Sequence, residues 1–294
     1  MLLGVTRAIF GKVGVVLMSL VSYSGEPSDG PRLLMFHGVT RRAYDLEPLY
    51  SAINGRINWQ AFDLLGHGES PRANRRYVVV DYVDAIAPII TGIDQPPVYL
   101  FGHSLGAMVA LMAASRWPDF VRGVILEDPP FSTMGDRFHS SLLRLQFEGL
   151  SRLLRQFDDE EGLYRGLTEL PVKRASDGAV VRFIEVRDAA SLRTYARYLR
   201  NVDPAVLDPI VGGMWMDRYN LSTVCASVRC PVLVFQACQK LGGMLTDDDL
   251  STLQSGLPKC EVIKATESGH MIHATHSDQM VQALVRFLGA DVGV

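Results

Sequence analysis

One serine combines the residue type and the local spacing that nucleophilic catalysis needs. Ser104 lies in Gly102-His103-Ser104-Leu105-Gly106, after an apolar run and before a helix-like segment. Two glycines let a strand and a helix approach closely through a tight turn, which leaves the serine hydroxyl exposed at its tip. A helix start also favours negative charge that develops nearby. The alternative is an ordinary helix-capping serine. Because partner residues are also present, we predict that Ser104 is a nucleophile.

A serine hydroxyl needs a base that removes its proton, and histidine titrates in the useful pH range. Among seven histidines, His270 follows the apolar run 261–265 through Thr266-Glu267-Ser268-Gly269. Such a loop lies at the carboxyl edge of a parallel sheet, level with Ser104. We predict His270 as the base. His273, three residues later, is the alternative and a candidate substrate-binding residue.

The elements that must position these residues alternate between two patterns. Short apolar runs at 33–36, 56–62, 97–101, 121–126, 231–237 and 261–265 are typical of buried strands, and helical spacing appears at 77–93, 105–117, 247–254 and 278–288. Between 131 and 227 helical patterns replace the strand-like runs. We predict an α/β fold with a mostly parallel, doubly wound sheet. Residues 1–130 and 228–294 form its core, and residues 131–227 form an inserted helical lid.

Four motifs in this order resemble the α/β-hydrolases: Phe36-His37-Gly38-Val39, Asp63-x-x-Gly66-x-Gly68-x-Ser70, Gly102-His103-Ser104-Leu105-Gly106 and Gly269-His270. The resemblance runs from about residue 12 to residue 290 and is thin across the lid. It implies the α/β-hydrolase fold with His270 as the base. It also implies that the backbone N–H groups of Val39 and Leu105 bind the oxyanion. We expect His37 to brace its loop, and Asp63 with the following glycines to shape a turn.

The acid that orients the histidine departs from the commoner family pattern. Most α/β-hydrolases carry it shortly after the strand that corresponds to 231–237, but Cys238-Gln239-Lys240-Leu241-Gly242-Gly243 contains no carboxylate. Asp128 follows strand 121–126, whose end a right-handed crossover places beside Ser104, and some family members use this position. We predict Asp128. The alternatives are Glu127, which should point to the opposite face of an extended strand, and Asp247–Asp249, which a helix cap already explains.

Composition excludes several other functions. The 294 residues are 48% apolar and 21% charged, with a net charge of −3, which is ordinary for a globular enzyme and offers no surface for nucleic acid. Four cysteines have neither CxxC nor zinc-site spacing, so we expect reduced, buried thiols and no metal. Neither a GxxxxGK[ST] nor a GxGxxG motif occurs. We expect no metal and no organic cofactor.

The amino terminus has two interpretations. Arg7 and Lys12 precede the apolar run 13–21, which superficially resembles a secretory signal within residues 1–24. We favour two edge strands, 2–10 and 13–23, joined by a turn at Gly11-Lys12. The run is also shorter than the roughly 20 residues that span a bilayer. We therefore expect a cytoplasmic protein without stable membrane insertion.

These observations predict a serine hydrolase that cleaves a carboxylic ester or lactone through an acyl-serine intermediate. An apolar cluster in the lid, Met214, Trp215, Met216 and Tyr219, with Phe131 and Met134 at its entrance, indicates a largely hydrophobic small-molecule substrate. Candidate substrate-binding residues are His37, Phe131, Met134, Trp215 and His273. Two alternatives are a hydrolase of carbon–carbon bonds in diketone-like substrates and a ligand receptor with a residual triad. Serine at the elbow disfavours a dehalogenase or epoxide hydrolase with an aspartate nucleophile.

Overall fold

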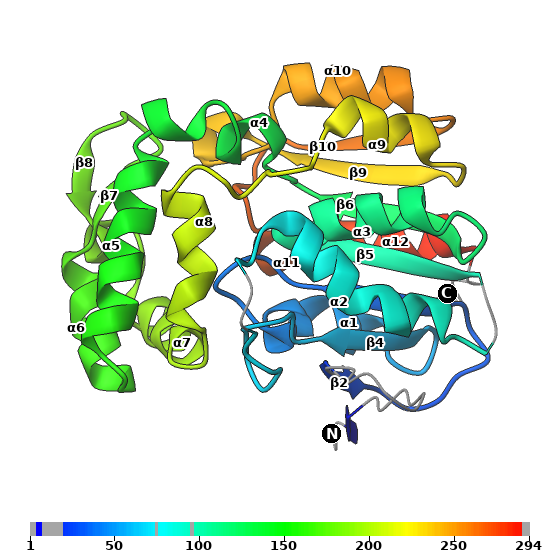
Figure 1. Cartoon of the computed structure of the whole chain (residues 1–294), viewed down its shortest axis with the longest axis horizontal. Helices are drawn as coiled ribbons and strands as arrows, with labels where there is room; N and C mark the ends of the chain where they lie inside the picture. Colours follow the sequence, from blue (N-terminus) through cyan, green and yellow to red (C-terminus); the bar gives the residue numbers. More distant parts are fainter. Residues whose placement is uncertain (1–3, 8–19, 74–75, 95–96, 290–294) are drawn as a thin grey trace.

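The computed structural model describes residues 4–7, 20–73, 76–94 and 97–289 (Figure 1). Within these ranges eight strands form one sheet in the order β1-β2-β4-β3-β5-β6-β9-β10. The six strands from β4 onward in this order are parallel: β4 (Asn58–Phe62), β3 (Arg32–Phe36), β5 (Val98–His103), β6 (Val121–Glu127), β9 (Val232–Ala237) and β10 (Cys260–Ala265). The predicted α/β fold with a mostly parallel sheet is therefore confirmed.

Two antiparallel strands extend the sheet at one edge. β1 (Gly4–Arg7) pairs with β2 (Val21–Ser24), and β2 pairs with β4. β1 lies within the predicted strand 2–10, and β2 overlaps the predicted strand 13–23 at residues 21–23 and extends one residue beyond it. The predicted turn at Gly11-Lys12 lies outside the described residues. In the described ranges, none of the helices combines the length and the apolar character that a membrane crossing requires.

Helices cover both faces of the sheet because side chains alternate along each strand. In β3, Leu34 and Phe36 join one core and Leu33 and Met35 the other. The first core is completed by helices on its side: α2 (Val79–Thr91), α3 (Leu105–Arg116), α9 (Leu221–Ser227) and α10 (Asp247–Gly256). The second is completed by a 3-10 turn and helices on the opposite side: η1 (Ala43–Leu46), α1 (Glu47–Ile53), α11 (Ile272–Thr275) and α12 (Ser277–Leu288).

Residues 131–220, between β6 and α9, form a separate layer at one end of the strands, most of it drawn at the left of Figure 1. Its elements are α4 (Phe131–Met134), η2 (Phe138–Ser140), α5 (Leu143–Gln156), α6 (Glu160–Glu169), β7 (Pro171–Lys173), β8 (Val180–Arg182), η3 (Phe183–Glu185), α7 (Ala189–Leu199), η4 (Pro204–Leu207) and α8 (Asp208–Val211). We call residues 131–220 the insertion. The antiparallel pair β7–β8 was not predicted, because each strand has three residues and no clear apolar alternation.

Hydrogen bonds tie both ends of the insertion to the core. At its start, the N–H of Ser132 donates to Oδ2 of Asp249 in α10 (3.1 Å). Near its end, the N–H of Val79 in α2 donates to the carbonyl of Trp215 (3.0 Å). The middle of the insertion, residues 143–199, contains α5, α6 and α7, which pack on one another. The insertion is thus anchored near its two ends, and the hydroxyl of Tyr195, 2.9 Å from Oγ1 of Thr40, joins its middle to the core.

Candidate active site

Ser104 occupies a strained turn between β5 and α3. Its φ and ψ are 53° and −114°, a backbone conformation that a residue with a Cβ adopts only at an energetic cost. The flanking glycines permit this turn: a Cβ on Gly102 would lie 2.1 Å from the carbonyl carbon of Gly106, and a Cβ on Gly106 would lie 2.1 Å from the carbonyl oxygen of Phe36. The strand–turn–helix geometry predicted for this motif is therefore present, with the serine at its tip.

A cavity lies between the carboxyl ends of the strands and the insertion. Ser104 and His270 both line it from the core side. The insertion contributes mostly apolar and aromatic side chains to the wall: Met134, Leu143, Gln146, Phe147, Tyr195 and Trp215. The structure therefore brings the predicted nucleophile and the predicted base to one cavity that the insertion covers.

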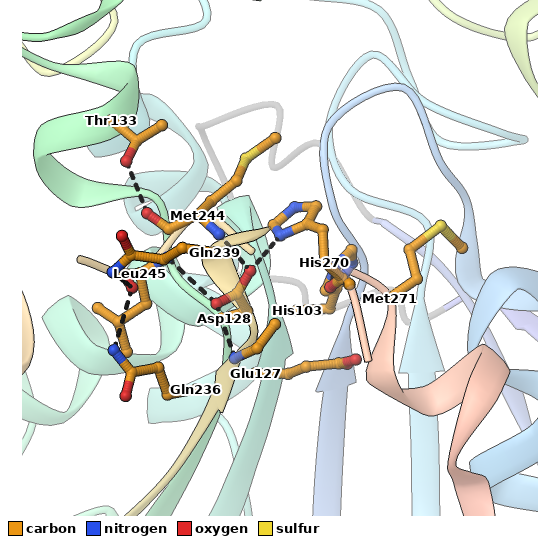
Figure 2. Close-up of polar contacts among 12 residues, drawn as sticks. His103, Glu127, Asp128, Thr133, Gln236, Gln239, Met244, Leu245, His270 and Met271 are labelled. Carbon is orange, nitrogen blue, oxygen red and sulfur yellow. Dashed lines mark hydrogen bonds and ion pairs between the residues drawn. The ribbon is translucent and has the colours of Figure 1, made fainter. Parts of the chain in front are cut away.

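Asp128 holds His270 in one orientation (Figure 2). Oδ2 of Asp128 lies 2.7 Å from Nδ1 of His270. The carboxylate also accepts three backbone N–H groups, from Ala237 (3.1 Å), Met244 (2.7 Å) and Leu245 (3.1 Å), and its residue is fully buried. A histidine whose Nδ1–H donates to a carboxylate presents Nε2 as the proton acceptor. His270 is therefore arranged as a general base, and Asp128 as the acid that orients it.

The other carboxylates considered for this position bind elsewhere. Asp247 accepts a hydrogen bond from Nε2 of Gln236 (2.9 Å), and Asp248 forms an exposed ion pair with Arg137 (2.7 Å). Asp249 accepts from Oγ1 of Thr246, which in turn accepts the N–H of Asp249 and caps α10. The predicted capping arrangement is observed here, and these carboxylates are engaged away from His270.

Glu127 and His273 form a second, fully buried pair behind the first. Nδ1 of His273 lies 2.8 Å from Oε2 of Glu127, and the N–H of His273 donates to Oε1 (2.8 Å). Nε2 of His273 lies 3.5 Å from Oδ2 of Asp45. Burial lowers the pKa of His273, but the charges of Glu127 and Asp45 outweigh burial and raise it to about 10. His273 is therefore a buried cation between two carboxylates.

The position of His273 differs from what a base or a substrate-binding residue requires. His273 was an alternative base and a candidate substrate-binding residue, yet its side chain is fully buried and its nitrogens face carboxylates. Potential ligand atoms of His103, Glu127 and His273 lie within 4.8 Å of one another, as a metal site would require. The Glu127 carboxylate already accepts hydrogen bonds from His273, however, so an ion pair accounts for this cluster.

His103 connects the two histidines. Its ring centroid lies 4.7 Å from that of His270 and 4.9 Å from that of His273. Burial lowers the pKa of His103 well below its ordinary value, so the ring is neutral. Nε2 of His103 lies 3.0 Å from the carbonyl oxygen of His270. Because a carbonyl oxygen can only accept, Nε2 carries the ring proton and donates this hydrogen bond. His103 thereby holds the backbone of the residue predicted to be the base.

Two backbone N–H groups are available beside Ser104. In the described part of the chain, no hydrogen bond engages the N–H of Val39 or of Leu105. Both were predicted as oxyanion donors, and Val39 lines the cavity. His37 supports this loop: Nδ1 donates to the carbonyl of Gly38 (2.7 Å), and Nε2 accepts the N–H of Leu64 (2.9 Å). Burial lowers the pKa of His37 to about 4, so it is neutral in this bracing position.

Asp63 organises the turn that follows β4. Its Oδ1 accepts the N–H of Ala43 (2.8 Å) and its Oδ2 accepts the N–H of Glu69 (2.9 Å). Gly68 has a φ of 55°, and a Cβ there would lie 2.0 Å from Oδ2 of Asp63. The motif around Asp63 therefore shapes a turn, as its sequence indicated.

The predicted substrate-binding residues divide into two groups. Met134 and Trp215 line the cavity. His37, Phe131 and His273 are not among the residues that line it. Sequence reasoning missed several cavity residues: Thr40, Arg41, Leu143, Gln146, Phe147, Tyr195, Met244 and Met271. The sequence indicates a place for Arg41 beside the cavity, because Arg41 follows the predicted oxyanion residue Val39 by two positions.

The strand order and the strained serine between a strand and a helix define the α/β-hydrolase fold. A family model described as the alpha/beta hydrolase family matches residues 33–283, so the chain belongs to this family. The crystal structure of an E-2-(acetamidomethylene)succinate hydrolase superposes with a TM-score of 0.69 and 22% identity, covering 98% of this chain and all of the other. An enol-lactonase from Burkholderia xenovorans superposes with a TM-score of 0.67 and 14% identity, covering 92% of this chain and 97% of the other.

Sequence relatives point to the same family. A 2-(acetamidomethylene)succinate hydrolase of Mesorhizobium japonicum is 39% identical over 103 residues, which are 35% of this chain and 37% of that protein. An (E)-2-((N-methylformamido)methylene)succinate hydrolase of Acinetobacter baylyi is 21% identical over 269 residues, which are 90% of this chain and 92% of that protein. The chain thus matches little more than a third of the Mesorhizobium protein's length.

Proposed function

We propose that this protein is a serine hydrolase that cleaves a carboxylic ester or lactone of a small molecule through an acyl-serine intermediate. The proposal depends most on the 2.7 Å contact between Oδ2 of Asp128 and Nδ1 of His270, at the cavity that Ser104 lines. This contact leaves Nε2 of His270 as the proton acceptor, and His270 lines the same cavity as Ser104. Membership of the α/β-hydrolase family supports hydrolysis as the reaction class.

In the proposed reaction, Nε2 of His270 takes the proton of Ser104 as Oγ attacks the carbonyl carbon. The N–H groups of Val39 and Leu105 bind the negative oxygen of the tetrahedral intermediate. When the C–O bond breaks, protonated His270 gives its proton to the leaving alcohol. A water that His270 deprotonates then attacks the acyl-serine, and the carboxylic acid leaves. Asp128 keeps its negative charge throughout and stabilises the imidazolium.

The cavity wall supports a small substrate with an apolar portion. Leu143, Phe147 and Trp215 contribute apolar surface opposite the proposed catalytic residues. Two relatives act, by their names, on substituted succinates, and they support hydrolysis of a small organic acid derivative. We infer that the substrate is a small molecule.

The direct test compares wild type with Ser104→Ala on p-nitrophenyl acetate and butyrate. We expect Ser104→Ala to lower kcat by about a thousandfold or more, because removal of the nucleophile leaves only binding and oxyanion stabilisation. Ser151→Ala is the matched control. Ser151 lies in α5 and bonds to Arg155 at the surface, so turnover should be unchanged.

A fluorophosphonate probe provides an independent readout. Wild type should gain the mass of one phosphonyl group on the peptide that contains Ser104, and Ser104→Ala should gain none. A wild-type protein that neither hydrolyses these esters nor reacts with the probe is not a serine hydrolase. A protein that reacts with the probe but shows a single burst without turnover fits the alternative of a ligand receptor.

A further inference from the structure

Arg41 places a positive charge on the wall of the cavity that Ser104 and His270 line. It follows the proposed oxyanion residue Val39 by two positions, and its N–H donates to the carbonyl of Gly38 (3.2 Å). The side chain is 22% exposed, so a substrate in the cavity can reach the guanidinium group. The proposed ester hydrolysis gives this charge no role.

The contacts of the Arg41 guanidinium leave most of its five donors unused. Nη2 donates to Sδ of Met271 (3.2 Å), which is a weak acceptor. Cζ lies 4.4 Å from the ring centroid of Tyr195, and Nη1 lies 3.8 Å from Oδ1 of Asp45, beyond hydrogen-bond distance. Within the described ranges, no carboxylate meets Arg41 with the two-point geometry that its planar fork favours.

Asp45 also has a second cation to neutralise. Its Oδ2 lies 3.5 Å from Nε2 of His273, which Glu127 contacts from the other side. Asp45 and Glu127 carry two negative charges, and His273 and Arg41 carry two positive charges, so these four groups balance. Asp45 is thus shared between two cations, and its 3.8 Å distance from Arg41 leaves the guanidinium free to meet a second anion in the cavity.

We propose that Arg41 binds a free carboxylate of the substrate, so that the preferred substrate is an ester or lactone that also carries a carboxylic acid group. A carboxylate fits because its two oxygens match the arginine fork. This inference rests on the proposed hydrolysis and narrows its substrate class. It also changes the expectation of a largely hydrophobic substrate, since the apolar wall contacts only the carbon skeleton and Arg41 receives the charged end.

The kinetic test uses two esters with the same leaving group. Mono-p-nitrophenyl glutarate carries a free carboxylate, and p-nitrophenyl pentanoate is its neutral counterpart. For wild type we expect kcat/KM to favour the glutarate ester by about tenfold or more, as one charge-assisted hydrogen-bonded contact provides. Arg41→Gln should lower this ratio by about tenfold, chiefly through KM, and Arg41→Lys should lower it less.

Arg193→Gln is the matched control. Arg193 also lies on a tyrosine ring, 4.0 Å from the centroid of Tyr164, and it belongs to α7 like Tyr195. It pairs with Glu161 at the surface and does not line the cavity. The substitution removes the same charge from the molecule, so the ratio between the two esters should stay at the wild-type value.

A binding measurement separates this proposal from the proposed hydrolysis. Calorimetric titration of Ser104→Ala with glutarate should give saturable binding that weakens about tenfold in Ser104→Ala/Arg41→Gln. If wild type hydrolyses both esters without preferring the anionic one, the carboxylate site is wrong and the hydrolase stands. If neither ester is hydrolysed, the hydrolase proposal fails, and glutarate binding alone decides the carboxylate site. Equal glutarate binding with and without Arg41 overturns it.

Discussion

Glu127 and Asp128 are consecutive residues, yet their carboxylates bind different histidines of one loop. Asp128 lies 2.7 Å from His270, and Glu127 lies 2.8 Å from His273. Figure 2 shows the two acidic side chains pointing apart at the end of β6. Because the loop is held at two points three residues apart, the imidazole of His270 has both its position and its orientation fixed.

Asp128→Asn should remove most of the activity and leave the fold intact. An amide cannot stabilise the imidazolium and favours the wrong tautomer of His270, so we expect kcat to fall by about 10³- to 10⁴-fold. Asp248→Asn is the control, since Asp248 pairs with Arg137 at the surface. Ester kinetics and circular dichroism of both variants check this expectation. Near-normal turnover by Asp128→Asn would show that another carboxylate orients the base.

Glu127→Gln should reduce stability more than it reduces chemistry. The pKa of His273 in the folded state is about 10, above its ordinary value of about 6.5. The charged His273 therefore contributes its full share of the free energy of unfolding below about pH 6.5. This contribution is lost as the pH rises toward 10. Removal of one partner of a buried ion pair costs about 3–5 kcal/mol.

Thermal unfolding between pH 6 and pH 10 tests this stability prediction. Wild type should lose Tm across this range through His273. Glu127→Gln should start from a lower Tm at pH 6 and depend less on pH. Two parallel Tm curves would show that Glu127 does not set the charge of His273.

His103→Leu should impair positioning of the base. The substitution removes the donor to the carbonyl of His270, at 3.0 Å in the structure, and leaves that carbonyl without its partner. We expect kcat to fall about tenfold with little change in KM, as the loss of one hydrogen bond of about 1.4 kcal/mol would produce. His103→Gln, whose amide can donate again, should recover part of the loss. Equal losses in both variants would point to ring packing instead.

Gly106→Ala should strongly destabilise the folded state. A Cβ would lie 2.1 Å from the backbone carbonyl oxygen of Phe36, and neither backbone segment can move without disturbing the sheet. We expect a loss of at least about 3 kcal/mol in the free energy of unfolding. Gly55→Ala is the control, because Gly55 has a φ of 77° but open space around it, so the cost is only the roughly 1 kcal/mol of strain. Urea unfolding of both variants compares them.

The sheet and the position of Asp128 could be predicted because local sequence determines them. The elbow around Ser104 needs glycines at fixed positions, and the strand before Asp128 is a continuous apolar run. A right-handed crossover then places the end of that run beside the elbow without any knowledge of side-chain contacts. The opposite direction of Glu127 follows from strand alternation in the same way.

The buried contacts of His273 and the environment of Arg41 could not be predicted. Asp45, Glu127 and His273 come from three distant segments, and nothing in any one segment shows that the other two are near. Tyr195 likewise lies in an amphipathic helix whose pattern does not say which residue faces the cavity. Such contacts depend on how the insertion packs on the core, and local patterns carry no information about that packing.

The anchoring of the insertion at both ends has a consequence for how substrate preference could change over evolution or by design. Contacts such as Ser132–Asp249 and Val79–Trp215 attach the insertion to the core outside its middle part. The cavity side chains of α5 and α7 lie in that middle part. New specificities can therefore arise by exchange of residues 143–199, while the attachment points and the reaction machinery beneath them stay the same.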